Sequence, residues 1–102
     1  MSEKTYIYIA LRSDLSRPQQ SVQASHAAIE AARRFLNSYS EHPSIIVLNM
    51  KDEKAIRKFR DNCPVEFAEF REPNIENQLT AIATCAIFGD QRNYFRKYQL
   101  IK

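Results

Sequence analysis

Strand-like and helix-like segments alternate along this chain, and the alternation constrains its fold more than any other feature. Thr5–Leu11 (TYIYIAL) and Ser44–Met50 (SIIVLNM) are apolar on both faces, which is typical of buried strands, and Thr5–Leu11 suits a central one. Leu79–Phe88 is a third long apolar segment. Val65–Arg71 alternates polar with apolar residues, as a strand nearer a sheet edge does. The pattern therefore predicts an α/β domain with four strands.

Helices are predicted between these strands. Ser16 and Gln19 have the spacing of a capping box at the start of the first helix. Asp52 caps a second helix that ends before Cys63–Pro64, and a short third helix covers Gln91–Tyr98. The order β-α-β-α-β-β-α favours a three-layer fold with a mainly parallel sheet, whose last two strands pair antiparallel.

A helical wheel divides the first helix, which is predicted to run to Asn37, into two faces. The apolar face also carries Ser25 and consists of Val22, Ile29, Ala32, Phe35 and Leu36. The opposite flank is a polar stripe formed by Gln19, Gln23, His26, Glu30 and Asn37. We expect the apolar face to pack on the sheet and the polar stripe to stay outside the core.

The composition is that of one folded domain without a membrane or secretory signature. In 102 residues, 44% hydrophobic and 26% charged content exclude a disordered chain and leave room for a single core. Apolar runs such as Ile45–Leu48 are too short to cross a bilayer, so a cytoplasmic protein is expected. Cys63 and Cys85 are accordingly predicted to be reduced, and their spacing from His26 and His42 is unlike a zinc site.

The charge distribution is compatible with an anionic partner. A total of 15 Lys and Arg against 12 Asp and Glu gives a net charge of +3, which permits nucleic-acid binding without requiring it. Arg12 and Arg17 lie near the start of the first helix, where free N–H groups suit a phosphate. Further cations crowd the C-terminus: Arg92, Arg96, Lys97 and Lys102. Because a small core buries a modest share of the surface, a homodimer is also expected to be favourable.

Several catalytic motifs are excluded by the sequence. Gly89 is the single glycine, so neither a P-loop nor a G-x-G-x-x-G turn exists, and no cofactor is expected. Ser25 and His26 are neighbours on a helix and point about 100° apart, so they cannot form a dyad. His26, beside Gln23 and near Asp14, is left as a candidate general base or phosphate contact.

The last long strand adds hydroxyl groups beside a polar loop. Thr80 and Thr84 are spaced by two strand repeats, so both side chains are expected on one face. The loop before them holds Asn74, Asn77 and Gln78. This start of the strand is more polar than a purely structural strand requires.

The order of these motifs resembles the class II peptidyl-tRNA hydrolases. Leu11–Leu15 (LRSDL) and Gln23–Ala28 (QASHAA) are similar to the family's R-x-D-L strand end and its Q-x-S-H-A-A helix. Asp52–Glu53 resembles the acidic pair that follows the family's second strand. Arg71–Asn74 (REPN) and Leu79–Ala83 (LTAIA) resemble the bacterial branch. The similarity extends in order over nearly the whole chain.

The resemblance implies a single domain over residues 1–102 with a four-stranded mixed sheet flanked by helices, often dimeric. It also implies hydrolysis of the ester that joins a peptide to the terminal ribose of tRNA. Gln23 and His26 carry over to this chain as candidate catalytic residues. Asp14 and Thr80 carry over as neighbours of the same site.

The chain departs from the family's pattern just before the first helix. Better-known members have a G-K-G-K-type loop with a lysine that is important for catalysis. Here the loop is two residues shorter, with Gln19 at the place of the lysine, and an amide cannot supply its charge. Arg17 is the nearest cation that could compensate. The family's D-A-G-x-T-Q loop is also missing, and Glu72 is the nearest acidic substitute.

Three hypotheses about function remain open. In the first, a water attacks an RNA-linked ester, with His26 or Glu72 as the base and Gln23, Asn77 or Thr80 as orienting groups. In the second, the same cleft binds tRNA or a small nucleotide without turnover. In the third, the substrate is another nucleotide, such as a cyclic oligonucleotide, again with His26 as the base. Substrate contacts are expected from Arg12, Asp14, Arg17, Gln19 and Asn77.

Overall fold

A computed structural model of the chain describes residues 4–35 and 43–102. Its elements are β1 (Tyr6–Arg12), α1 (Arg17–Arg34), β2 (Ser44–Met50), α2 (Glu53–Asn62), β3 (Phe67–Glu72), the 3-10 turn η2 (Pro73–Ile75), β4 (Gln78–Thr84) and the 3-10 helix η3 (Gly89–Lys97). Both predicted helix caps are confirmed, since the side chains of Ser16 and Asp52 accept backbone N–H groups of the first turn. Leu36, Asn37 and His42 lie outside the described residues.

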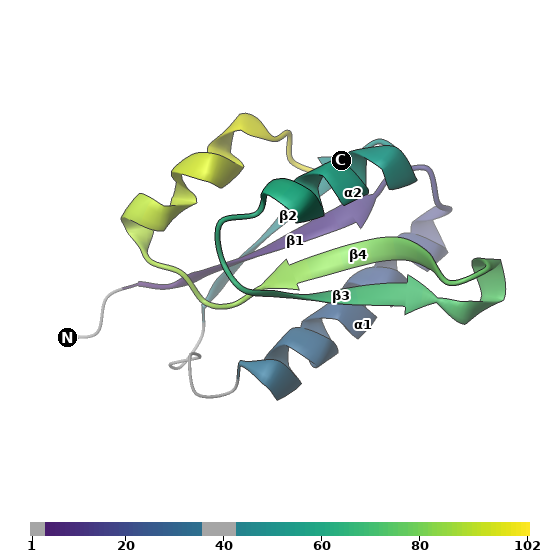
Figure 1. Cartoon of the computed structure of the whole chain (residues 1–102), viewed down its shortest axis with the longest axis horizontal. Helices are drawn as coiled ribbons and strands as arrows, with labels where there is room; N and C mark the ends of the chain where they lie inside the picture. The colour runs from purple at the N-terminus through teal and green to yellow at the C-terminus, as the bar shows by residue number, and fades with distance from the viewer. Residues whose placement is uncertain (1–3, 36–42) are drawn as a thin grey trace.

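The four strands form one mixed sheet in the order β2-β1-β4-β3 (Figure 1). β1 and β2 are parallel, whereas β4 is antiparallel to both β1 and β3. The α/β class with a four-stranded mixed sheet is therefore confirmed, as are the edge position of β3 and its antiparallel pairing with β4. The expectation of a mainly parallel sheet is wrong, because β4 inserts between β1 and β3 and runs against both.

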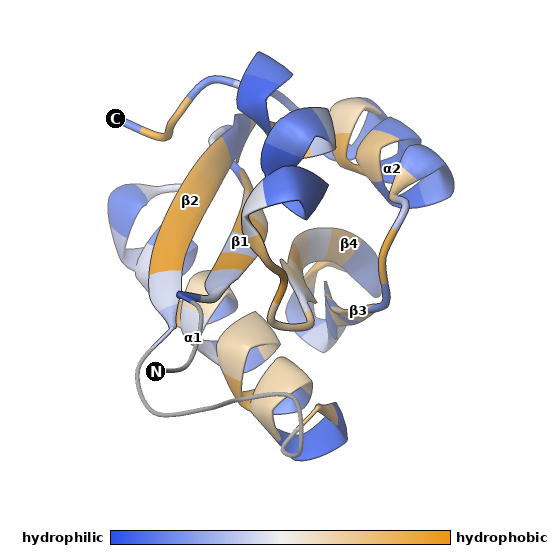
Figure 2. Ribbon diagram, turned by 90° about the vertical axis from the view of Figure 1, so that its left-hand side faces the viewer, coloured by the Kyte–Doolittle hydropathy of each residue, from blue (hydrophilic) through white to orange (hydrophobic). Residues whose placement is uncertain are grey.

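β2 is an edge strand and is only partly buried, although its sequence predicts a buried strand. Leu48 is buried, but Ile45 is 59% exposed. Residues 99–101 lie along the outer edge of β2 and hydrogen-bond to the backbone of Val47 and Asn49. Figure 2 shows this hydrophobic strand at one side of the sheet. The apolar composition of β2 thus reflects packing against its faces and a covered edge, and not a central position.

Helices cover both faces of the sheet and complete the three layers (Figure 1). α2 and η3 pack on one face, where Tyr8 and Phe95 stack with ring centroids 4.5 Å apart and Phe59 is fully buried. α1 packs on the other face, against small residues of β3 and β4. No helix within residues 4–35 or 43–102 is long and apolar enough to span a membrane.

The face of α1 that contacts the sheet differs from the predicted one. Gln23, Ala27 and Ala31 are fully buried, whereas Val22 is 43% and Ile29 is 57% exposed. The physical reason is shape. Alanines on α1 meet the alanines of β3 and β4, so that the helix lies close to the sheet, and larger side chains would not fit between them. Residue volume decides the contact face here, more than residue hydrophobicity does.

This packing predicts opposite outcomes for two substitutions on the same helix. Ala27→Leu should lower the free energy of unfolding by about 1–3 kcal/mol, because the added atoms have no space at the helix–sheet contact. Ile29→Gln should change it by less than about 0.5 kcal/mol, because the side chain is exposed. Urea unfolding of both variants measures the difference. Equal destabilisation of the two would mean that the predicted apolar face contacts the sheet after all.

Candidate functional site

Polar side chains gather at one end of the sheet. β1 and β3 end there, β4 begins there, and both α1 and α2 start at the same end (right-hand side of Figure 1). The first backbone N–H groups of the two helices therefore point toward this end and give it a partial positive charge. The carboxyl ends of strands are also where open α/β sheets bind their ligands.

The centre of the site is the side-chain amide of Gln23, which is fully buried between α1 and the sheet. Its Nε2 donates to Oε1 of Glu72 at 2.8 Å and to Oε1 of Gln19 at 3.1 Å. Its Oε1 accepts from the hydroxyl of Thr80 at 2.7 Å. Both N–H groups are thus used within the protein, and Gln23 acts on its neighbours rather than on a ligand.

A bulge in β4 brings Thr80 into this network. Phe70 pairs with Ala81 and the next residue of β3 pairs with Leu79, so the pairing passes over Thr80. The bulge turns the Thr80 hydroxyl toward α1, while Thr84 faces the other side and accepts the N–H of Tyr8. The expectation that the two threonines share a face is therefore wrong, because the extra residue breaks the alternation of the strand.

Glu72 ends β3 and has a fixed orientation. One carboxylate oxygen accepts from Gln23, and the other accepts the N–H of Asn74 at 3.4 Å as the cap of η2. The chain then reverses through Glu76 and Asn77, which both adopt left-handed backbone angles with φ of 61° and 59°. Asn77 is exposed and donates its backbone N–H to the carbonyl of Glu72. Its side chain is not part of the Gln23 network.

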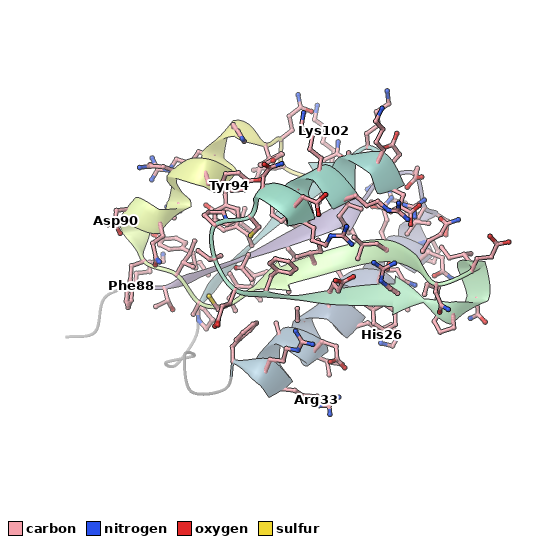
Figure 3. The ribbon with its side chains drawn as sticks, in the orientation of Figure 1. His26, Arg33, Phe88, Asp90, Tyr94 and Lys102 are labelled. Atoms are coloured by element: carbon pink, nitrogen blue, oxygen red, sulfur yellow. The ribbon has the colours of Figure 1, made fainter. Side chains whose placement is uncertain are left out.

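His26 lies one helical turn beyond Gln23 and is exposed (Figure 3). Its imidazole stacks on the ring of Phe70 from β3, with centroids 4.3 Å apart and an interplanar angle of 10°. Stacking of this kind fixes the plane of the ring and leaves its nitrogen-bearing edge open to a ligand. The exposed position of His26 agrees with the predicted polar stripe; among the members of the stripe that the structure describes, Gln23 is the one that is fully buried.

Arg12 and Asp14 form a second polar cluster at the same end. The guanidinium of Arg12 is buried and donates to both oxygens of Asp14 at 2.9 and 2.8 Å. It also donates to Oε1 of Gln78 at 2.9 Å and to the carbonyl of Leu79 at 3.3 Å. The hydrogen bonds between Arg12 and Asp14 lower the pKa of Asp14 below its usual value and raise the pKa of Arg12. Arg12 thus joins the end of β1 to the start of β4, with little donor capacity left for a phosphate.

The remaining predicted residues fall into two groups. Gln19 touches the network directly, because its Oε1 accepts from Gln23. Arg17 is exposed and lines a separate hollow between α1 and β2, together with Lys102. The structure therefore brings together Gln19, Gln23, Glu72 and Thr80, places His26 beside them, and leaves Arg17 and the Asn77 side chain apart.

Some contributors to this site are not among the predicted site residues. Phe70 reads as an ordinary strand residue, yet it supports His26. Glu53 accepts the backbone N–H of Leu79 at 3.1 Å and so anchors the start of β4 from α2. Gln78 was part of the predicted polar loop, but its bond to Arg12 depends on the pairing of distant strands. Such contacts follow from topology and not from local spacing.

The two cysteines lie away from this end of the sheet. Both are free and partly buried, and burial raises the pKa of the Cys63 and Cys85 thiols. Thiols with raised pKa values are poor nucleophiles at neutral pH. Within the described ranges, no group of three His, Cys, Asp or Glu side chains is arranged to hold a metal ion.

Comparisons with known proteins assign the chain to no family. No family model matches the sequence, and no curated protein matches it. The protein is an α/β domain with a mixed sheet and a buried glutamine network at one end of that sheet. The similarity to class II peptidyl-tRNA hydrolases is a hypothesis that rests on its motifs.

The Gln23 network predicts strong coupling between two substitutions. Thr80→Val should lower the free energy of unfolding by about 1–3 kcal/mol, because it leaves the buried oxygen of Gln23 without a donor. In the double variant Gln23→Leu/Thr80→Val the loss should be smaller than the sum of the single losses, by about 0.5–3 kcal/mol. Denaturant unfolding of the four proteins measures this coupling. Ser25→Ala, on the exposed side of α1, is the control and should be nearly neutral. Additive losses would show that Gln23 and Thr80 are not coupled.

Proposed function

We propose that this domain hydrolyses the ester at the 3′ end of an acylated RNA of the peptidyl-tRNA type, with Glu72 as the general base. The observation that supports this proposal is the 2.8 Å hydrogen bond by which buried Gln23 orients the Glu72 carboxylate. Apolar residues would fill the space under α1 at lower cost in stability than a glutamine and a threonine. Local rules of this kind are broken mostly at functional sites.

The proposed reaction uses a water molecule held by Glu72. Glu72 removes a proton from the water as its oxygen bonds to the ester carbonyl carbon. The tetrahedral intermediate collapses, the bond from carbon to the ribose oxygen breaks, and Glu72 returns the proton to the leaving oxygen. Gln23 acts as a positioning residue, because its own donors are used in holding Glu72 and Gln19.

His26 and the N-terminus of α1 are assigned to the substrate's RNA end. The edge of the stacked imidazole is open to a phosphate or a ribose hydroxyl. Arg17 stands in the first turn of α1, where its charge and the helix dipole both favour an anion. Arg12 does not take part in this contact, since Asp14 and Gln78 occupy its guanidinium. Its role is to hold the strand ends in place.

Substitution of Glu72 tests the proposed base. Glu72→Gln should lower kcat on peptidyl-tRNA by about 100-fold or more, because an amide cannot accept the proton from water. Glu76→Gln removes a neighbouring exposed carboxylate and should leave kcat unchanged. His26→Ala should lose most of its turnover while its unfolding midpoint stays near that of the wild type. If His26→Ala lowers kcat and Glu72→Gln does not, the base is His26.

Substitution of Gln19 tests the link to the lysine-bearing family. The wild type should be a slow hydrolase, because Gln19 offers a dipole where a lysine would offer a full charge to the developing oxyanion. Gln19→Lys should therefore raise kcat on peptidyl-tRNA, while Ser21→Lys adds the same charge elsewhere on α1 and should not. A wild type that neither binds nor cleaves tRNA at low salt contradicts the proposal. A panel of small nucleotides, read for binding and turnover, then separates the two other hypotheses.

A further inference from the structure

Three lysines surround a hollow on the face of the molecule opposite α1. Lys51 follows β2, Lys58 lies on α2 and Lys97 lies on η3, so the hollow is formed by segments far apart in the sequence. Its volume is about 470 Å³, and Asn49 and Tyr98 complete its polar lining. Among the described residues, no carboxylate lines this hollow. Figure 1 shows that α2 and η3 cover the same face of the sheet.

The lysines of this hollow have no acidic partner among the residues that the structure describes. All ion pairs found there use arginine as the cation: Arg12, Arg33, Arg57, Arg60 and Arg71. Lys97 instead lies over the rings of Tyr94 and Tyr98, at 4.5 and 5.4 Å from their centroids. Like charges that face one hollow repel each other, and an anion between them removes this cost.

A second cationic hollow adjoins the first and shares Tyr98 with it. Its volume is about 300 Å³, and Arg92 and Arg96 line it together with aromatic and aliphatic residues such as Phe95 and Leu48. Arg92 donates to the hydroxyl of Tyr8 at 2.9 Å, which fixes its guanidinium. Within the part of the chain that the structure describes, this hollow also has no acidic lining residue. Cations therefore continue along the face on both sides of Tyr98, which suits a chain of anions better than one small anion.

We infer that this face binds the phosphate backbone of an RNA, with Lys51, Lys58 and Lys97 as the phosphate contacts. Charge complementarity supports the inference, and the choice of RNA as the polyanion rests on the proposed function. The position of the hollow also agrees with the proposed site. Lys51 directly follows Met50, whose carbonyl accepts the N–H of Ser13 at 2.8 Å next to the Arg12–Asp14 pair. The hollow thus opens near the end of the sheet that holds the Gln23 network.

Substitution of the three lysines tests the inference. The probe is labelled deacylated tRNA. Lys51→Gln/Lys58→Gln/Lys97→Gln should weaken binding on the order of tenfold at low salt. It should also reduce the slope of log affinity against log salt concentration by about 2, because each of the three lost phosphate contacts contributes about 0.7 on a single strand. The matched control Arg33→Gln/Arg34→Gln/Lys54→Gln loses the same charge outside both hollows and should keep the wild-type slope. The triple Lys→Arg variant should bind like the wild type.

Further measurements separate this inference from the proposed function. With peptidyl-tRNA, the triple Gln variant should raise KM and leave kcat unchanged. With an N-acetyl-aminoacyl ester of adenosine, which has no RNA body, its turnover should equal that of the wild type. If the wild type cleaves neither ester but binds tRNA through these lysines, the proposed function fails and the inference stands. If the triple Gln variant keeps the wild-type affinity for tRNA and the wild-type salt dependence, the inference is wrong. Lysine-dependent binding to phosphatidylserine vesicles without binding to tRNA also overturns it.

Discussion

The hydrogen bonds of one buried amide, that of Gln23, hold three parts of this protein in register. The amide joins α1 to Thr80 of β4 and to Glu72 at the end of β3, and each partner comes from a different element. A buried amide that loses such partners costs about 1–3 kcal/mol for each unsatisfied group. A helix shifted by one turn, or a β4 strand without its bulge, would leave Gln23 unpaired. The position of α1 on the sheet and the orientation of Glu72 therefore depend on the same contacts.

Close approach of α1 to the sheet makes these short hydrogen bonds possible. Ala27 and Ala31 continue the buried face of the helix beyond Gln23, and small residues of β3 and β4 lie beneath them. With larger residues at these positions the helix would stand farther from the sheet, and the side chain of Gln23 would not reach both Thr80 and Glu72. The exposure of Val22 and Ile29 follows from this arrangement, because the side of the helix that satisfies the glutamine also determines which residues face solvent.

Periodicity and caps predict where elements of this chain begin and end, but not how those elements meet. The helix starts at Ser16 and Asp52 follow from local hydrogen-bonding chemistry, and the structure has both. The edge position of β2 and the bulge at Thr80 depend on pairing between distant strands, and a regular two-residue alternation cannot express an extra residue. For the same reason the sequence identifies the members of the candidate site better than their roles. Arg12 reads as a free cation near a helix start, yet a carboxylate two residues away occupies it.

The segment between β1 and α1 shows how a chain with one glycine forms this end of the sheet. Hydrogen bonds hold it from both sides: Arg12 binds Asp14, and the side-chain amide of Gln20 donates to the carbonyl of Leu15 at 2.8 Å. A short loop fixed in this way needs no glycine and places the start of α1 directly beside the strand ends. Gln19 then reaches the Gln23 network from the first turn of α1. Under the proposed resemblance to the lysine-bearing family, Gln19 in the first turn of α1 is the position at which a lysine would add a charge beside the Gln23 network.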